Sequence, residues 1–301
     1  MTAFASAKPF PIPVVAAYVP ELAHEDDGLD YLPMPSGMDT YRAPPLPEPE
    51  ELAGHAGAVR VLREALAQLD KATRGEPAAA VSLAGLSPDD LALVNQVLGE
   101  GEVSAQVLAA PDGGQHAAQA QGHAQVQESV FAGVWRVVEV RPDGQVHDRI
   151  EVGDVPALLR QAARDDAAAP RAAVLAPPPG MVNVPSILAE LEDQRARWQP
   201  GDATHVVNLT LLPLAPADIG YLDHVLGTGR VLILSRGYGN CRITDTQVPN
   251  TWRVVYYNSQ DTVILNSVEV TAMPEVACAA LEDLIDSHER LAEVLAWVEQ
   301  G

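Results

Sequence analysis

Val97-Leu-Gly-Glu-Gly-Glu-Val103 occurs a second time, with two substitutions, as Val225-Leu-Gly-Thr-Gly-Arg-Val231, an offset of 128 residues from 97 to 225. Each copy joins the end of an apolar helical segment to a Gly-x-Gly turn and the start of a strand. Trp135-Arg-Val-Val138 likewise recurs as Trp252-Arg-Val-Val255, an offset of 117 residues from 135 to 252. Because the expected elements follow in the same order in both halves, the sequence indicates an internal duplication.

The repeated elements also predict the fold class. Short strands separated by short loops favour antiparallel neighbours, and helices with an apolar stripe accompany them. We expect an α+β protein made of two tandem, similar α/β lobes with mostly antiparallel sheets, preceded by an extended Pro-rich arm. The expected boundaries are an arm at 1–51, a first lobe at 52–165, an Ala/Pro linker at 166–180 and a second lobe at 181–301.

Several helices have clear signals. Residues 58–71 carry apolar side chains at helical spacing, and Ser87-Pro-Asp-Asp90 combines an N-cap Ser, a Pro at the first position and acids in the first turn. An acidic helix is expected from Pro274 to Glu299, with its apolar stripe packed on the second lobe. The polar run Arg236–Ile243, by contrast, is read as a compact loop that follows the strand Val231–Ser235.

Composition and charge exclude several classes of function. The net charge of −22 opposes sequence-independent binding of nucleic acid and docking on anionic membranes. The two cysteines, Cys241 and Cys278, are too few and too far apart for a disulfide scaffold or a four-thiolate metal site. We see neither a signal peptide nor an unbroken apolar run of about 20 residues, so we expect a cytoplasmic protein with no membrane partner.

The first 51 residues differ from the rest of the chain. Ten prolines lie within the first 50 residues, and acids outnumber bases by nine to two through residue 58. Such a composition cannot form a regular helix. Its large side chains predict docking either on the chain's own domain or on a partner. The expected docking residues are Tyr31, Leu32, Met34, Met38 and Tyr41.

Distinctive polar residues gather in the second half. Features present in both copies are assigned to folding, whereas features of one copy are candidates for a specialised function. The candidate binding surface consists of Arg236, Gly237, Tyr238, Gly239, Asn240, Cys241, Arg242, Asn258, Ser259 and Asn266. We expect these residues to converge near the ends of neighbouring strands.

Three interpretations of this surface remain open. The Gly-x-Gly at 237–239 would hold an anion with Arg236 and Arg242, although it opens no helix, unlike dinucleotide and P-loop motifs. Cys241 would be a nucleophile with its thiolate favoured by Arg242, but no His lies in a recognisable catalytic motif. In the third interpretation Asn240 caps a turn, Cys241 packs as a small apolar residue and Arg242 bonds backbone carbonyls. Without a catalytic motif or metal-ligand spacing, we expect no enzyme activity, no metal site and no cofactor.

Four stretches together resemble the HupH/HyaF/HoxQ family of hydrogenase operon proteins. They are Leu32-Pro-Met-Pro-Ser-Gly-Met38, Arg236-Gly-Tyr-Gly-Asn-Cys-Arg-Ile243, Trp252 and Asn258-Ser-Gln-Asp-Thr-Val-Ile-Leu-Asn-Ser-Val-Glu-Val270. The resemblance spans the arm and the C-terminal lobe, and the Gly-Tyr-Gly-Asn-Cys-Arg-Ile run is its most specific part. The loop at 109–125 adds nothing to it.

The resemblance implies a cytoplasmic accessory protein, or chaperone, for [NiFe]-hydrogenase maturation. It implies binding to the iron–sulfur small subunit, together with a thioredoxin-like hydrogenase chaperone, before twin-arginine export and subunit assembly. No established enzymatic activity comes with the family, so no catalytic residues are carried over. The alternative is a thiol- or metal-handling maturation enzyme that uses Cys241.

Overall fold

The computed structural model describes residues 54–109, 122–171, 176–178, 180–237 and 239–299. The expected docking residues of the arm and one residue of the candidate surface lie outside these ranges, namely Tyr31, Leu32, Met34, Met38, Tyr41 and Tyr238. The docking of the arm therefore stays a prediction.

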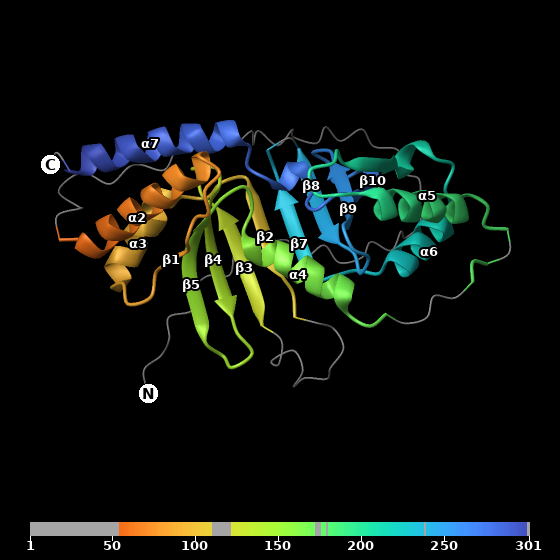
Figure 1. Cartoon of the computed structure of the whole chain (residues 1–301), viewed down its shortest axis with the longest axis horizontal. Coiled ribbons are helices and arrows are strands. Elements are labelled where there is room, and N and C mark those ends of the chain that lie inside the picture. Colours follow the sequence, from red (N-terminus) through yellow and green to blue (C-terminus); the bar gives the residue numbers. More distant parts are fainter. Residues whose placement is uncertain (1–53, 110–121, 172–175, 179, 238, 300–301) are drawn as a thin grey trace, which may run out of the picture. The chain divides into compact units, whose positions relative to one another are not determined.

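The described residues form a ten-stranded sheet with helices packed against it (Figure 1). The strand order is β1-β5-β4-β3-β2-β7-β8-β9-β10-β6, and neighbouring strands are antiparallel throughout. The strands are β1 (Val81–Ser82), β2 (Val103–Val107), β3 (His123–Glu128), β4 (Val134–Val140), β5 (Val146–Val152), β6 (His205–Asn208), β7 (Val231–Ser235), β8 (Asn240–Asp245), β9 (Thr251–Tyr257) and β10 (Val263–Val270). The predicted mixture of helices and antiparallel strands is confirmed, but the sheets expected in two lobes are joined into one.

Helices precede and follow the strands in each half. They are α2 (Ala56–Thr73), α3 (Pro88–Leu98), α4 (Ala157–Ala168), α5 (Asn183–Arg197), α6 (Pro216–Leu226) and α7 (Leu281–Glu299), with 3-10 turns η1 (Leu209–Leu211) and η2 (Glu275–Ala277). Helix α3 begins as predicted, because the Ser87 side chain accepts a hydrogen bond from the Asp90 backbone N–H at 3.0 Å. Among the described helices, none combines the length and apolar character needed to cross a membrane.

Corresponding elements of the two halves have boundaries that differ by constant numbers of residues. Helix α3 and strand β2 lie 128 residues before α6 and β7, while β3 and β4 lie 117 residues before β8 and β9. Strands β2 and β7 pair with each other, and the centre of the pairing is Ala105 opposite Ile233, residues that are themselves 128 apart. Matching strands thus meet at the middle of the sheet, and each covers an edge that the other would otherwise leave open.

The two faces of the sheet carry different elements, because successive side chains of a strand point to opposite sides. Helix α4 crosses one side of the sheet, in front of β2, β3 and β7 (Figure 1), and we call this side the α4 face. Trp135 and Val137 point to it. Arg136 points to the other side, and the strand register places Arg242 there too. This Arg242 face packs against α2 and α3 in the first half and against α5 and α6 in the second.

The C-terminal helix corrects one expectation about packing. Helix α7 begins at Leu281 rather than at Pro274, and it lies along α2 of the first half instead of packing on the second (Figure 1). Its buried Leu284, Leu291 and Leu295 share a core cluster with Val61 and Leu62 of α2. Of the apolar residues that the amphipathic pattern assigned to the stripe, Leu281 and Ile285 are exposed. A stripe also does not specify which surface covers it.

Helix α4 of the first half packs in turn on the second half, and the sequence analysis did not predict this helix. Asp166 of α4 accepts hydrogen bonds from the backbone N–H and from Nε of Arg230, both at 2.6 Å. Leu159 and Ala162 of α4 are buried in the same cluster as Ile233 of β7. Each half therefore contributes a helix that packs on the other half, and residues 166–168 of the predicted linker are helical.

Candidate functional site

The second half of the polar run at residues 236–243 is strand rather than loop, which corrects the interpretation of the whole run as a compact loop. Strand β7 ends at Ser235, and β8 already begins at Asn240. Gly239 has a φ of +100°, a left-handed conformation that favours glycine. The two glycines around position 238 therefore belong to the short connection of a β-hairpin, and the residues after them alternate between the two faces of the sheet.

This alternation separates Cys241 from Arg242. Cys241 is only 3% exposed and lies in the core of the α4 face, with Tyr256 as its polar neighbour. Arg242 is exposed on the opposite face, where its guanidinium lies 5.7 Å from the centre of the Tyr257 ring. Burial raises the pKa of the Cys241 thiol to about 12. The geometry therefore gives Arg242 no direct role in stabilising a Cys241 thiolate.

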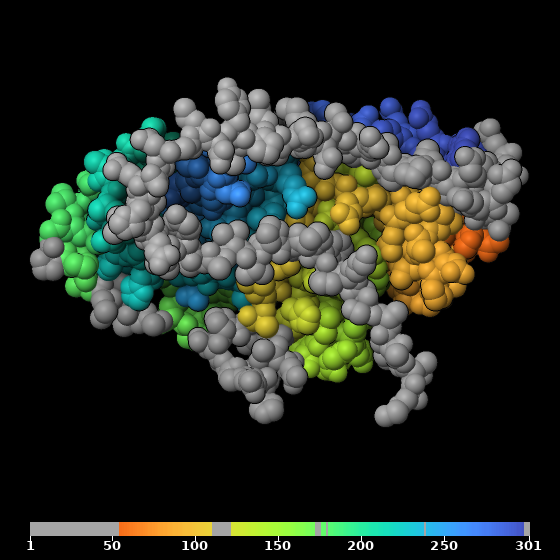
Figure 2. Space-filling model, turned by 180° about the vertical axis from the view of Figure 1, so that it is seen from behind, coloured from red at the N-terminus to blue at the C-terminus, as the bar shows by residue number. Residues whose placement is uncertain are grey.

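Other candidate residues do gather on the Arg242 face. Asn240, Arg242 and Asn266 project from β8 and β10 to this side, since Arg242 pairs with Val255 of β9 and Val255 pairs with Asn266. The exposed Arg236, Gly237 and Gly239 lie at the connection that leads into β8. Figure 2, from behind, shows β7 to β10 (cyan to blue) reaching the surface between the teal helices of the second half and α3 (gold).

Asn258 and Ser259 belong to a turn instead. The side-chain oxygen of Asn258 accepts hydrogen bonds from the backbone N–H groups of Gln260 and Thr262, both at 2.9 Å. This arrangement holds the connection between β9 and β10, and Ser259 is exposed on it. Asn258 thus has a structural role that accounts for its presence without a ligand.

Sequence reasoning missed an apolar patch beside Asn266. The backbone N–H of Asn266 donates to the hydroxyl of Thr210 in η1 at 2.8 Å. Leu211 and Leu212, which follow Thr210, are exposed, as are Val263 and Ile264 at the start of β10. The sequence pattern of β10 did not predict this patch. Val263 and Ile264 are exposed because β6 pairs only with the later part of β10, and the chain then turns into η1. Grouped exposed apolar side chains of this kind mark interaction surfaces.

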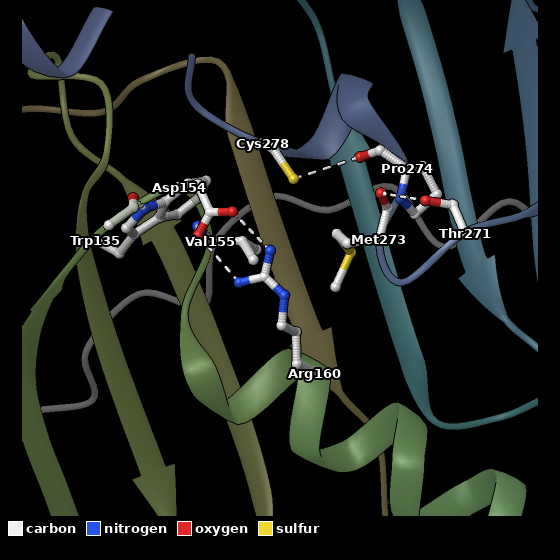
Figure 3. Close-up of polar contacts among 9 residues, drawn as sticks. Trp135, Asp154, Val155, Arg160, Thr271, Met273, Pro274 and Cys278 are labelled. Carbon is white, nitrogen blue, oxygen red and sulfur yellow. Dashed lines mark hydrogen bonds and ion pairs between the residues drawn. The ribbon is translucent and has the colours of Figure 1, made fainter. Parts of the chain in front are cut away.

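The second cysteine lies where the chain passes from β10 towards α7 (Figure 3). Its sulfur is 3.6 Å from the carbonyl oxygen of Pro274, and burial raises its pKa to about 12. Arg160 of α4 forms two hydrogen bonds with Asp154 nearby, at 3.0 and 2.6 Å. In the described ranges, no three side chains of His, Cys, Asp or Glu are grouped so that they could hold a metal ion.

The thiol geometry gives a first testable prediction. In the native protein at pH 8, Cys241 and Cys278 are expected to react with an aromatic disulfide reagent far more slowly than a free thiol, because burial disfavours both thiolates. In urea both thiols should react at the rate of unfolded cysteine. Cys241→Ser should retain the native circular dichroism spectrum and the slow thiol of Cys278. Rapid reaction of one thiol in the native wild type, absent in Cys241→Ser, would show that Cys241 is accessible after all.

Two buried carboxyl groups occupy matching positions at the ends of β3 and β8. Glu128 accepts a hydrogen bond from the Gly133 backbone N–H at 3.2 Å, and Asp245 accepts one from the Val231 N–H at 2.9 Å. Burial raises the pKa of Glu128 to about 7. Burial, and then the adjacent Asp166 carboxyl, raise the pKa of Asp245 well above its ordinary value. The sequence shows acids at both positions, but their burial depends on the packing of other elements.

Comparison with known proteins gives matches along nearly the whole chain. The family model described as "HupH hydrogenase expression protein, C-terminal conserved region" matches residues 56–175 and again residues 181–298. A hydrogenase expression/formation protein HoxQ of Cupriavidus necator is 53% identical over 289 residues, which cover 96% of this chain and 98% of that protein. HupH of Rhodobacter capsulatus, also named a hydrogenase expression/formation protein, is 45% identical and covers 90% of this chain and 91% of its own.

More distant matches carry related names. The hydrogenase-1 operon protein HyaF of Escherichia coli is 33% identical over 281 residues, covering 92% of this chain and 93% of its own. A solved structure of the hydrogenase expression protein HupH from Thiobacillus denitrificans is 24% identical, with a TM-score of 0.36, and covers 38% of this chain and 95% of its own. A TM-score this low supports no conclusion about the fold.

Proposed function

The chain belongs to the HupH family of hydrogenase expression proteins, and from that premise we propose that it is an accessory protein of [NiFe]-hydrogenase maturation that binds the iron–sulfur small subunit. Relatives that match nine-tenths or more of the chain are named for hydrogenase expression or formation. We place its action in the cytoplasm, before export and subunit assembly, with a thioredoxin-like hydrogenase chaperone as a second partner.

The observation that best supports a binding function is a mixed polar and apolar surface on the second half of the chain. It combines the exposed Arg242 with a neighbouring patch of exposed apolar side chains around Leu211 and Ile264. An unfinished subunit exposes apolar and charged groups that later become buried, and such a mixed surface suits transient contact with them. The proposed client surface therefore consists of Arg242, Asn240, Asn266 and the apolar residues Leu211, Leu212, Val263 and Ile264.

We also propose that the chain consists of two repeats, at 52–165 and 181–301, joined by a linker and preceded by the arm. The constant offsets between matching elements support this division, and so does the double match of a single family model. In this proposal the arm, through Tyr31, Leu32, Met34, Met38 and Tyr41, docks beside the hairpin that contains residues 236–243. Its richness in proline and in large apolar side chains supports an extended, docked segment.

The alternative of a thiol- or metal-handling enzyme finds no support in the position of Cys241. Its sulfur is buried, its pKa is raised, and Arg242 points to the other face of the sheet. Nucleophilic catalysis needs an accessible sulfur that is readily ionised. A binding role is thus the function that the geometry favours.

A second prediction tests this function. The tagged full chain, purified from cells that express the complete hydrogenase operon, is expected to bring down the precursor of the small subunit and the thioredoxin-like chaperone. Mass spectrometry identifies both proteins, and cells with the tag alone provide the control. Recovery of the large subunit without the small subunit, or of neither hydrogenase subunit, would contradict the proposed client.

A further inference from the structure

Helix α7 packs on two neighbours in the first half, helix α2 and the turn between β3 and β4. Leu291 of α7 lies in the same buried cluster as Leu62 and Leu69 of α2. Nη2 of Arg290 donates to the carbonyl oxygen of Val130 in the turn at 3.1 Å. Helix α2 and this turn together thus form a surface that binds a helix.

The second half contains the same turn between β8 and β9. In the first half the Ser129 hydroxyl donates to the Phe131 carbonyl oxygen at 2.8 Å and accepts from the Phe131 N–H at 3.1 Å. In the second half the Thr246 hydroxyl makes the same two contacts with Val248, at 3.2 and 3.1 Å. Each residue lies 117 positions after its counterpart, as the flanking strands do. The two turns are therefore equivalent in geometry as well as in sequence position.

Helix α5 has in the second half the position that α2 has in the first. Helix α2 packs on α3, β1 and β5, and α5 packs on the matching elements α6, β6 and β10. At an offset of 126 residues their buried residues correspond, namely Ala58 with Val184, Val61 with Ile187 and Ala65 with Leu191. The surfaces that α2 and α5 bury against the rest of their own halves therefore match.

The two helices differ on the side that faces α7 in the first half. Leu62 and Leu69 of α2 are fully buried. Their counterparts in α5, Leu188 and Arg195, are both partly exposed. Among the described helices, none packs along α5 as α7 packs along α2. The second half thus has the turn and the helix of this binding surface without the helix that it binds.

Helix α4 corresponds to the beginning of α7 and stops early. Besides burial, the charge of Asp166 in α4 raises the pKa of Asp245. The charge of Asp283 in α7 likewise contributes to the raised pKa of the buried Glu128, so the two aspartates occupy matching positions 117 residues apart. Helix α4 ends at residue 168, two residues after its aspartate, whereas α7 continues to residue 299, sixteen residues after its own. The part of α7 that lies along α2 therefore has no counterpart in α4.

A groove of about 490 Å³ lies where this part of the helix is missing. Leu188, Glu192 and Arg195 of α5 form one wall, and Val248 and Pro249 of the β8–β9 turn form another. The fourteen residues by which α7 exceeds α4 span about 21 Å, or nearly four helical turns. The groove thus matches the place that the first half gives to the body of α7.

The chain has no further helix of its own for this groove. Only six residues separate Pro170, just after α4, from Pro177, which is too few for four turns. Helix α7 is already packed on α2, and the Pro-rich first 51 residues cannot form a regular helix. A helix in the groove must therefore come from another protein.

The charges along the groove favour an acidic occupant. Nη2 of Arg171, which lines the groove, donates to the carbonyl oxygen of Val225. Arg164 of α4, beside the same turn, donates to an amide oxygen. In the described part of the chain, Arg195 has an ion pair with Glu192 at 2.5 Å, but no carboxylate pairs with Arg171 or Arg164. In a chain with a net charge of −22, this local excess of positive charge attracts acidic side chains.

We propose that the groove binds an acidic, amphipathic helix of a partner protein. Its apolar stripe packs on Leu188, Val248 and Pro249. Carboxylates beside the stripe pair with Arg171 and Arg195. The bound helix takes on α5 the position that α7 holds on α2, and this binding mode lays an apolar helix face into a preformed groove.

The groove and the proposed client surface lie at opposite ends of the same strands. The groove borders the β8–β9 turn, whereas residues 236–239 and 258–259 belong to the β7–β8 and β9–β10 connections. The two connections of a strand are at its opposite ends. The helix site is therefore independent of the proposed client and serves a second partner.

A labelled peptide with the sequence of α7, residues 281–299, is the probe, because it is an acidic amphipathic helix that fits the matching surface of the first half. Fluorescence anisotropy of this peptide, titrated with the full chain, measures the dissociation constant. The wild type is expected to bind it, and Arg171→Glu should weaken binding by about tenfold. Arg197→Glu, an equal charge change at an exposed position of α5 outside the groove, is the matched control and should bind as the wild type does.

A second variant tests the equivalence of the two surfaces. Glu192→Leu combined with Arg195→Leu restores the leucines that α2 has at the matching positions, Leu66 and Leu69. This variant is expected to bind the peptide about tenfold more tightly than the wild type, because apolar contacts replace polar ones. Its binding should also weaken less when salt is added. Circular dichroism shows that each variant is folded.

The inference is overturned if the wild type does not bind the peptide, or if Arg171→Glu binds it as tightly as Arg197→Glu does. It is also overturned if the leucine variant binds no more tightly than the wild type. None of these measurements involves a hydrogenase subunit. The helix site can therefore fail while the small subunit is still captured, and the capture can fail while the peptide still binds.

Discussion

Replacing Leu291 with Ala is expected to lower the free energy of unfolding by about 3 kcal/mol. Leu291 is fully buried, and it packs with residues of α2 that lie more than two hundred positions earlier in the chain. Removing its side chain leaves a cavity between two helices that are both held by other contacts, so the site cannot collapse to fill it. Equilibrium unfolding in urea, followed by circular dichroism, measures the change.

Ile285→Ala on the same helix is the matched control. Its side chain is 43% exposed, so the expected loss is within about 0.5 kcal/mol. Equal effects of the two substitutions would mean that α7 does not pack on α2. A large effect of Leu291→Ala alone supports the packing of α7, from the second half of the chain, on α2 of the first half.

The pH dependence of stability is the second large expected effect. The folded-state pKa of Asp245 is raised above its unfolded value, and that of Glu128 is raised to about 7. Between about pH 5 and pH 8 the folded protein therefore holds protons that the unfolded chain has already released. Stability consequently falls as the pH rises through this window. The contribution of these carboxyls is largest at the acidic end and is lost towards pH 8.

Asp245→Asn should remove much of this loss. The amide mimics the protonated carboxyl: its oxygen still accepts from the Val231 N–H, and its N–H₂ donates to Asp166. The variant is expected to be about 2 kcal/mol more stable than the wild type at pH 8 and nearly equal to it at pH 5. Urea unfolding at both pH values measures the difference.

Glu128→Gln, at the matching position of the first half, should also reduce the fall in the free energy of unfolding between pH 5 and pH 8, but by a smaller amount than Asp245→Asn. A wild-type stability that rises from pH 5 to pH 8, or an Asp245→Asn variant with an unchanged slope, would contradict the assignment of the buried carboxyls.

Local signals predicted some elements accurately and missed others. Ser87 and Pro88 begin α3 as expected, because an N-cap and a first-turn proline act through neighbouring backbone groups. Helix α4 was missed because its alanines resemble a linker and the residue before it, Pro156, makes no side-chain cap. Strand β8 was missed because the glycines at 237 and 239 and the polar residues that follow are typical of a loop.

Long-range features lay beyond such reasoning. The pairing of β2 with β7 and the packing of α7 on α2 depend on which surfaces meet, and no periodicity within an element specifies that. Among the candidate residues, Asn266 was identified because it differs from Asp148 in the other copy. Arg253 was assigned to folding because its Trp-Arg-Val-Val run is repeated, and its ion pair with Asp223 of α6 agrees with that assignment.

Quantitative capture of the small-subunit precursor by three forms of the full chain tests the central claim most directly. The forms are the wild type, Arg242→Glu on the proposed client surface, and Arg197→Glu, an equal charge change at an exposed position of α5. The account predicts equal capture by the wild type and Arg197→Glu, and a loss of about tenfold or more for Arg242→Glu. Equal capture by all three forms would contradict the proposed surface, and capture by none would contradict the proposed client.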